Sequence, residues 1–388
     1  MNYFVYVLLS LTLLLWGDQD KLRIDGKYGL YISREEDHWA ANWLTSAQEQ
    51  GIYKTGEDGM SLSTASAVIH RAFISSSEPL LFEFGSATNM TSIPLRFEFE
   101  RPGDHFENVD SIYVLGDLHG QYQNALNILK KAGLTDKNDR WAGGKKHLVF
   151  LGDVFDRGND AIRLLWYIYE LEDQAEAAGG KVHFVLGNHE LMIMAHDDRY
   201  ISPKERHIAT LHQKPFGGMF DPQTSLLGRW LATKPGILRI DDALFMHGGL
   251  ITELPENSIR GFNDKLYHTL QEPVLSQILN DEYDSTIYDP NTRRSVRSFI
   301  YDTWGPFWYR GYVQSDTLSP YLDYSLQTHN AQLQVVGHTI VPTITSRYNG
   351  KVIATNVRVP GTEMLLLARK RKKYNCFRID SEGNMSEL

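Results

Sequence analysis

The 388-residue sequence has a single cysteine, Cys376, so it can form neither an intrachain disulfide nor a zinc site built from cysteines. It also lacks an apolar run of the about 20 residues that a membrane helix needs. Basic residues are outnumbered, 39 to 48, and the net charge of −9 argues against a nucleic-acid binder. Its chemistry must therefore come from oxygen and nitrogen side chains.

The apolar run from Tyr3 to Trp16 has the length of the hydrophobic region of a secretory signal. Polar residues follow it at once, but no Lys or Arg precedes it and no Ala-x-Ala pattern follows. We expect residues 1–20 to be a signal peptide and the protein to be periplasmic or secreted. An uncleaved membrane anchor and an apolar N-terminal strand are the alternatives, and membrane contact is expected only through this segment.

Residues 21–108 are expected to form a separate N-terminal segment of short strands and helices. Strand-like pieces flank a turn between Ile24 and Tyr31, and residues 36–50 have the composition of a helix. Alternating apolar and polar residues predict strands over 80–85 and 94–102. Near the other end of the chain, the basic run Arg369–Lys373 is expected to be a solvated face or loop.

From residue 109 to residue 380 the pattern becomes strand, glycine-containing turn and helix, repeated. Apolar strands are predicted at 111–115, 147–151 and 181–186, and two later strands at 243–246 and 333–336. Strands that alternate with helices indicate an α/β fold whose active residues sit at the carboxyl ends of the strands. We therefore expect residues 109–380 to be the catalytic domain.

Metal-ligating residue types follow each of these predicted strands. The set consists of Asp117, His119, Asp153, Asn188, His247 and His338. Such oxygen and imidazole ligands suit two divalent or trivalent ions such as Mn, Fe or Zn. With Asp153 as a bridge, the two ions could lie roughly 3.5–4 Å apart, as in enzymes that activate water for in-line displacement.

These residues stand in five sequence blocks: GDLHG at 116–120, GDVFDRG at 152–158, GNHE at 187–190, HGG at 247–249 and GH at 337–338. In sequence order and spacing the blocks resemble those of the calcineurin-like metallophosphoesterases, in particular the phosphoprotein phosphatase branch. The strings GRWLATKPGIL and PFWYRGY resemble the Shewanella-like protein phosphatases, the type of the bacterial cold-active protein tyrosine phosphatase. The resemblance implies a β-sandwich of two mixed sheets flanked by helices.

The resemblance also implies a role for each residue. Asp117, His119 and Asp153 would hold one metal, and Asp153, Asn188, His247 and His338 the other. His189, oriented by Asp156, would be the general acid. Phosphate oxygens would be bound by Arg157, Asn188 and Arg310.

Two positions depart from the family pattern. Val185 and Leu186 stand where an Arg often precedes the GNHE block, and Asn356 ends a strand where many relatives are expected to have an acid.

Single residues of this set also have ordinary structural explanations. Asp117 or Asn188 could cap a helix, Arg157 could form a surface salt bridge, and Arg310 could stack on Trp308 or Tyr309. The polar cluster His196–Arg199 is expected to be a solvated helix end. The structural explanations would have to coincide in five blocks, so we favour the site.

The predicted function is a phosphoprotein phosphatase that hydrolyses phosphotyrosine or phosphoserine/threonine through attack by a hydroxide bound to two metals. The expected partner is a phosphorylated protein or peptide. The alternatives are hydrolysis of dinucleoside polyphosphates or other small phosphoesters, and a phosphate-binding module without catalysis. The aromatic segment Trp304–Tyr312 could line a pocket for a phosphotyrosine ring or a nucleobase.

Overall fold

The computed structural model describes residues 21–24, 29–46, 53–54, 61–62, 67–74, 81–84, 91–251, 254, 258–272, 275, 277, 290–371 and 373–388. Within these ranges no helix is both long and apolar enough to cross a membrane. The predicted signal or anchor at 1–20 lies outside the described residues.

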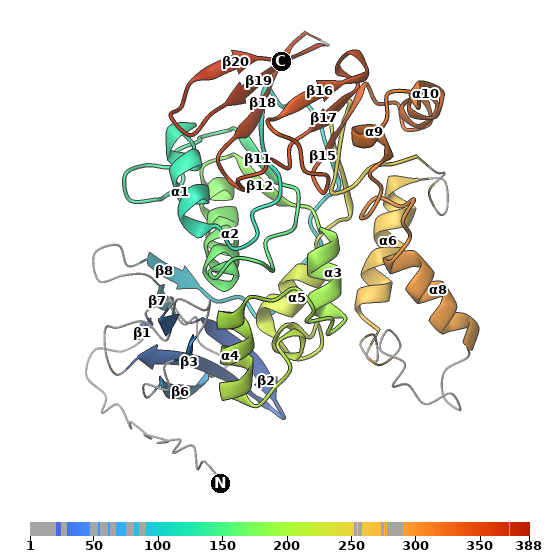
Figure 1. Ribbon diagram of the computed structural model, residues 1–388. Helices are drawn as coiled ribbons and strands as arrows, with labels where there is room; N and C mark the ends of the chain where they lie inside the picture. Colours follow the sequence, from blue (N-terminus) through green and yellow to red (C-terminus); the bar gives the residue numbers. More distant parts are fainter. Residues whose placement is uncertain are drawn as a thin grey trace.

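Two six-stranded mixed sheets form the centre of the molecule (Figure 1). The first has the order β12-β11-β10-β18-β19-β20, with bounds Lys181–Phe184, His147–Phe150, Ser111–Leu115, Met364–Lys370, Lys373–Ile379 and Met385–Glu387. The second has the order β16-β17-β15-β14-β13-β9, with bounds Thr345–Arg347, Val352–Ala354, Leu333–Val336, Ala243–Met246, Ile237–Ile240 and His105–Phe106. The expected fold of two mixed sheets flanked by helices is confirmed.

The helices follow the strands β10, β11, β12 and β14 along the chain. They are α1 (Tyr122–Lys131), α2 (Ala161–Ala177), α3 (Asn188–Met194), α4 (Pro203–His212), α5 (Leu226–Ala232), α6 (Ile259–Leu270), α8 (Pro290–Ile300), α9 (Gly311–Gln314) and α10 (Ser319–Thr328), with the 3₁₀ turns η2 (Gly217–Phe220) and η4 (Tyr348–Gly350). Strands β10, β11 and β12 pair in parallel, so their carboxyl ends meet at one edge. All the predicted strands of the catalytic region are present.

The N-terminal strands pack beside α2 and α4, away from α6 and α8 (Figure 1). They form the sheet β2-β3-β6 (Leu30–Glu35, His38–Ser46 and Ala67–Ile74), the sheet β1-β7-β8 (Lys21–Ile24, Leu81–Phe84 and Thr91–Pro94) and the pair β4-β5 (Tyr53–Lys54 and Ser61–Leu62). The indole N–H of buried Trp166 in α2 donates to the carbonyl of Leu30, 2.8 Å away.

The predicted domain boundaries stay predictions. β9 lies before residue 109 yet pairs with β13, and β20 extends the first sheet past residue 380.

Two secondary-structure predictions for the N-terminal segment are wrong. The predicted helix at 36–50 is the strand β3 from His38 to Ser46, because β2 and β6 hydrogen-bond to both of its edges and outweigh its helical composition. The predicted strand at 94–102 is absent, since β8 ends at Pro94. The Arg96 N–H donates to the Tyr169 hydroxyl at 2.9 Å, so this segment crosses α2 instead of joining a ladder.

The basic run near the C-terminus lies at the hairpin between β18 and β19, apart from Lys372, which is outside the described residues. Arg369 forms an ion pair with Asp241, so this member of the run is not simply solvated.

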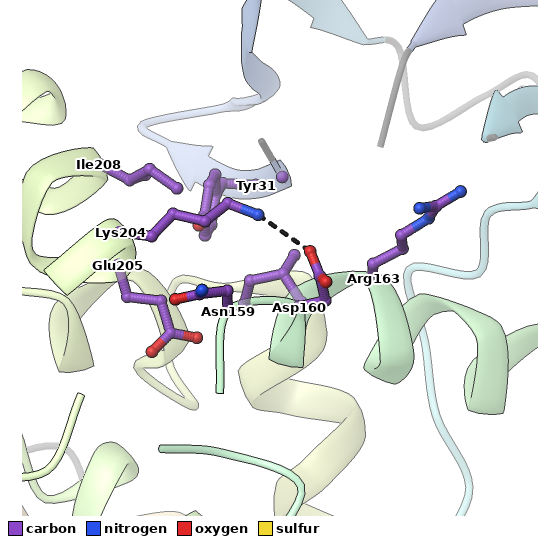
Figure 2. Close-up of a pocket in the computed structure, with 9 residues that line it drawn as sticks. Tyr31, Asn159, Asp160, Arg163, Lys204, Glu205 and Ile208 are labelled. Atoms are coloured by element: carbon purple, nitrogen blue, oxygen red, sulfur yellow. Dashed lines mark hydrogen bonds and ion pairs between the residues drawn. The ribbon is translucent and has the colours of Figure 1, made fainter. Parts of the chain in front are cut away.

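Helix α4 is tied to the loop that follows β11 (Figure 2). Its N-terminus has a capping box, in which Ser202 and Glu205 satisfy each other's backbone N–H groups. The Lys204 ammonium donates to Asp160 at 3.0 Å, and the Arg157 N–H donates to the carbonyl of Tyr200 at 3.1 Å. These contacts fix the residues before α4 next to the loop that carries Arg157.

Trp166→Phe should lower the free energy of unfolding by about 1–3 kcal/mol, because it removes buried ring volume and leaves the Leu30 carbonyl without its donor. Urea unfolding would measure the change. Trp141→Phe is the matched control, because its indole N–H also donates to a carbonyl, that of Gly144, but at an exposed site. Equal losses in the two variants would contradict the importance of the buried contact.

Candidate active site

The ends of β10, β11 and β12 are joined by backbone hydrogen bonds. The N–H groups of Leu118 and His119 donate to the carbonyl of Asp153 at 3.0 and 2.8 Å. The buried carboxylate of Glu190 accepts the N–H groups of Asp153, Val154 and Gly187, each at 2.8 Å. These bonds fix the three strand ends, and the side chains that follow them, relative to one another.

Several residues at these ends adopt left-handed backbone conformations, which non-glycine residues rarely do. Their φ angles are 42° at His119, 53° at Asp153, 70° at Asp156, 63° at Arg157 and 58° at His338. Each such residue costs of order 1–3 kcal/mol and persists only where surrounding structure holds it. Three of these residues, His119, Asp153 and His338, have side chains that gather in one cluster.

Glycine is required where the strand ends approach most closely. A Cβ added at Gly152, whose φ is +79°, would lie 2.2 Å from the Gly187 nitrogen, and one at Gly116 would lie 2.6 Å from the Thr355 carbonyl oxygen. The second contact joins the end of β10 in one sheet to the end of β17 in the other.

Two groups of possible metal ligands share Asp153. One is His119, Asp153 and His189, the other is Asp153, His247 and His338, and the ligand atoms of each group lie within 4.8 Å of one another. Asp153 Oδ2 is 3.9 Å from His119 Nε2 and 3.1 Å from His247 Nε2. The shared carboxylate has the position expected of a bridge between two ions.

Unpartnered atoms show that these residues fit a metal. His119 Nε2, Asn188 Oδ1 and His338 Nε2 are buried without a hydrogen-bond partner in the described part of the chain. The other ring nitrogens of His119 and His247 face the carbonyls of Phe155 and Leu151, at 2.8 and 2.7 Å. Donation to a carbonyl leaves each Nε2 as a lone-pair donor, the usual arrangement of a metal-binding histidine.

Asp117 lies at the junction of the two sheets. Its Oδ1 accepts the N–H of His338 at 2.9 Å, and its Oδ2 accepts the side-chain amide of Asn356 at 2.5 Å. Asp117 Oδ2 is also 3.8 Å from His119 Nε2. The structure therefore brings Asp117, His119, Asp153, His247 and His338 together, with Asn356 orienting Asp117, and Asn188 adjoins the cluster as the residue before His189.

The predicted catalytic dyad lies against the ligand cluster. His189 Nδ1 is hydrogen-bonded to Asp156 Oδ2, and its Nε2 is 3.7 Å from Asp153 Oδ2. This nitrogen also lies within 3.5 Å of Nη2 of Arg157. His189 thus presents one nitrogen toward the ligands and an arginine, while the other is held by a buried carboxylate.

Arg310 contacts the backbone of the predicted ligand His338. Its guanidinium donates to the carbonyl of His338 at 2.7 Å, which differs from the predicted alternative of stacking on Trp308 or Tyr309. Trp308 lies instead against the ring of His338, with the ring centroids 5.8 Å apart.

Comparison with known proteins agrees with this geometry. The family model of calcineurin-like phosphoesterases matches residues 111–342, which include every block of the site. The chain belongs to this family. The phosphoesterase is also similar in structure to a cold-active protein-tyrosine phosphatase of a psychrophilic Shewanella species. That match has a TM-score of 0.74 and 27% identity, and it covers 93% of this chain and 98% of the other.

Curated relatives match over shorter regions. Shewanella-like protein phosphatase 2 of Arabidopsis thaliana is 28% identical over 202 residues, 42% of the phosphoesterase chain and 52% of the plant protein. A symmetrical bis(5'-nucleosyl)-tetraphosphatase of Buchnera aphidicola is 26% identical over 189 residues, 47% of this chain and 61% of that protein. The phosphoesterase thus spans about half to three fifths of the length of these two relatives.

Two functional residues were missed by reasoning from sequence. Glu190 stands inside the GNHE block, but its role as a shared acceptor for three N–H groups depends on where the strands end. Asn356 was noticed only as a departure from an expected acid. Its contact with Asp117 spans 239 residues of sequence, which no local pattern reveals.

Buried charges shift the pKa values of the site. Burial lowers the pKa of His247, but Asp153 and Asp117 outweigh it and raise the value to about 9. Burial also lowers the pKa of His189, and Asp153 and Asp156 reverse the direction, so the pKa is raised. Burial raises the pKa of Asp117 to about 7. The cluster therefore favours a proton on His247 at neutral pH, and it shifts His189 toward its protonated form.

Metal affinity should rise with pH, because a metal ion must displace the proton of His247. Below its pKa of about 9, each rise of one pH unit should strengthen binding about tenfold or more as protons are released. Calorimetric titration of the metal-free protein with Mn²⁺ in buffers of different ionisation enthalpy would count those protons. Binding without proton release would contradict the expectation.

Glu190→Gln should lower the free energy of unfolding by about 1–3 kcal/mol and reduce the metal content, because an amide NH₂ would face backbone N–H groups. Chemical unfolding and elemental analysis would measure both effects. Glu176→Gln is the matched control, since Glu176 is 70% exposed in its ion pair with Lys181. A Glu190→Gln protein with unchanged metal content and stability would contradict the role of the shared acceptor.

Proposed function

We propose that the protein is a metal-dependent phosphoprotein phosphatase that hydrolyses phosphotyrosine or phosphoserine/threonine. The observation that carries the proposal is the His189–Asp156 dyad beside a ligand cluster centred on Asp153. The proposal is supported by similarity to the Shewanella protein-tyrosine phosphatase along nearly the whole chain.

The dyad supplies the proton that the leaving group needs. Asp156 holds Nδ1 of His189 and favours its charged form, so Nε2 can carry the proton that is passed to the ester oxygen. Asp153 and Asp156 together raise the pKa of His189, which is the direction that a general acid needs. Activity should fall as the pH rises through the pKa of His189, because the unprotonated ring cannot donate.

Asp117, His119, Asp153, Asn188, His247 and His338 would hold two metal ions of the Mn, Fe or Zn type. When bound, such ions supply an acidified water and neutralise charge on the transferred phosphoryl group.

Two arginines would orient the phosphate. Arg157 has its guanidinium beside His189 Nε2, and Arg310 is fixed to the carbonyl of His338 by one of its N–H groups. The remaining donors of each guanidinium are suited to bind phosphate oxygens in pairs. Asn188 has its side-chain oxygen buried without a partner in the described structure, where it would ligate a metal. Its amide NH₂ donates to the Met192 sulfur at 3.9 Å and has a second hydrogen for a phosphate oxygen.

A second candidate is the hydrolysis of dinucleoside polyphosphates. It is favoured by the similarity to the bis(5'-nucleosyl)-tetraphosphatase of Buchnera aphidicola. The two candidates share the ligand cluster and the dyad, so they differ only in what is bonded to the phosphate.

Phosphate release from phosphotyrosine and phosphoserine peptides should require added Mn, Fe or Zn, and Asp153→Asn should lower the rate by a factor of about 100 or more. Asp323→Asn is the control, because Asp323 pairs with Lys351 at the surface and is not a predicted ligand. Diadenosine tetraphosphate would be assayed in parallel. Hydrolysis of the dinucleotide alone would favour the second candidate, and hydrolysis of neither substrate class would refute both.

A further inference from the structure

An exposed aromatic ring stands beside the catalytic dyad. Tyr200 is 50% exposed, and its ring centroid is 5.6 Å from that of His189, with the planes tilted by 58°. Tyr200 adjoins the cluster His196–Arg199, which the sequence predicts to be a solvated helix end. Because half of the Tyr200 side chain is exposed, its burial stabilises the fold less than that of a fully buried ring would.

Neighbouring groups fix the position of this ring. The Tyr200 carbonyl accepts the N–H of Arg157, the residue next to the dyad member Asp156. The Arg199 guanidinium carbon lies 5.6 Å from the Tyr200 ring centroid, and two of its nitrogens each donate to Asp197 at 2.7 Å. An ordered ring loses less conformational entropy when it binds a ligand than a free one would.

Two further aromatic residues lie near the ligand cluster. Trp308 contacts the ring of His338, with the ring centroids 5.8 Å apart, and the ring centroid of Tyr301 lies 5.9 Å from that of Trp308. Aromatic rings therefore lie beside the dyad, at Tyr200, and beside the ligand His338, at Trp308.

The chemistry of the leaving group determines what lies next to His189. A general acid must come within about 2.6–3.2 Å of the oxygen that it protonates. In phosphotyrosine this oxygen is bonded directly to a phenyl ring, whereas in phosphoserine it is bonded to a small CH₂ group. The phenyl ring must therefore lie beside His189, where the exposed ring of Tyr200 already stands.

We propose that Tyr200 is a specificity-determining residue that packs against the phenyl ring of a phosphotyrosine substrate. This inference rests on the proposed phosphatase function and narrows it to aryl phosphate esters on proteins. Aromatic pairs prefer tilted or offset arrangements with ring centroids about 4.5–7 Å apart, and half of the Tyr200 surface is exposed to such a contact. Phosphoserine offers no ring and gains nothing from this contact.

Tyr200→Ala, Tyr200→Phe and the control Tyr321→Ala would be compared on two peptides of identical sequence that carry phosphotyrosine or phosphoserine. Tyr321 is a similarly exposed tyrosine of α10, with 58% exposure. Tyr200→Ala should lower kcat/KM on the phosphotyrosine peptide about tenfold, mainly through KM, and change the phosphoserine value less than about twofold. Tyr200→Phe retains the ring and should keep the preference of the wild type, as should Tyr321→Ala.

Equal losses on the two peptides in Tyr200→Ala would overturn the inference, because they would mean that Tyr200 only supports His189. An unchanged phosphotyrosine value would overturn it as well. Metal content and urea unfolding of each variant would exclude misfolding as the cause of a loss. If the proposed phosphatase function is wrong, the wild-type protein will release phosphate from neither peptide. This result differs from every outcome that concerns Tyr200 alone.

Discussion

The shared acceptor Glu190 is the interaction on which the rest of the site depends. Its two oxygens are buried and accept three backbone N–H groups from the ends of β11 and β12. Asp153 in turn accepts the N–H groups of Leu118 and His119, which extends the same bonding to the end of β10. One buried carboxylate therefore determines where three separate strands stop and turn.

The turns at these strand ends bring ionisable side chains together in a buried cluster. Asp153 stands close to His119, His189 and His247, and these histidines hold its pKa well below the usual range despite burial. The unfavourable backbone angles at Asp153 and Asp156 persist because the hydrogen bonds around them outweigh the local strain. Catalytic geometry and electrostatics in this protein thus follow from how the strands end.

Strands and candidate ligands could be predicted from the sequence where a short local pattern determines the structure. The strand and turn blocks around Asp117, Asp153 and Asn188 are recognisable because each contains an apolar run, a glycine and a polar residue in fixed spacing. The strand β3 was predicted as a helix because pairing with β2 and β6 is a tertiary effect that residue composition does not reveal. The contacts of Glu190 and Asn356 were invisible for the same reason, since each requires knowledge of which backbone groups lie nearby.

The contacts of Asp117 have a consequence for the order of folding. They join residues 221 and 239 positions apart, and closing such long loops is entropically costly and slow. A chain emerging from the ribosome can pair β10 with β11 and β12 early, but Asp117 meets its partners only after residue 356 has been synthesised. The ligand cluster therefore forms only late in synthesis, after the strands of the second sheet have been made, and a bound ion would report that the two sheets have come together.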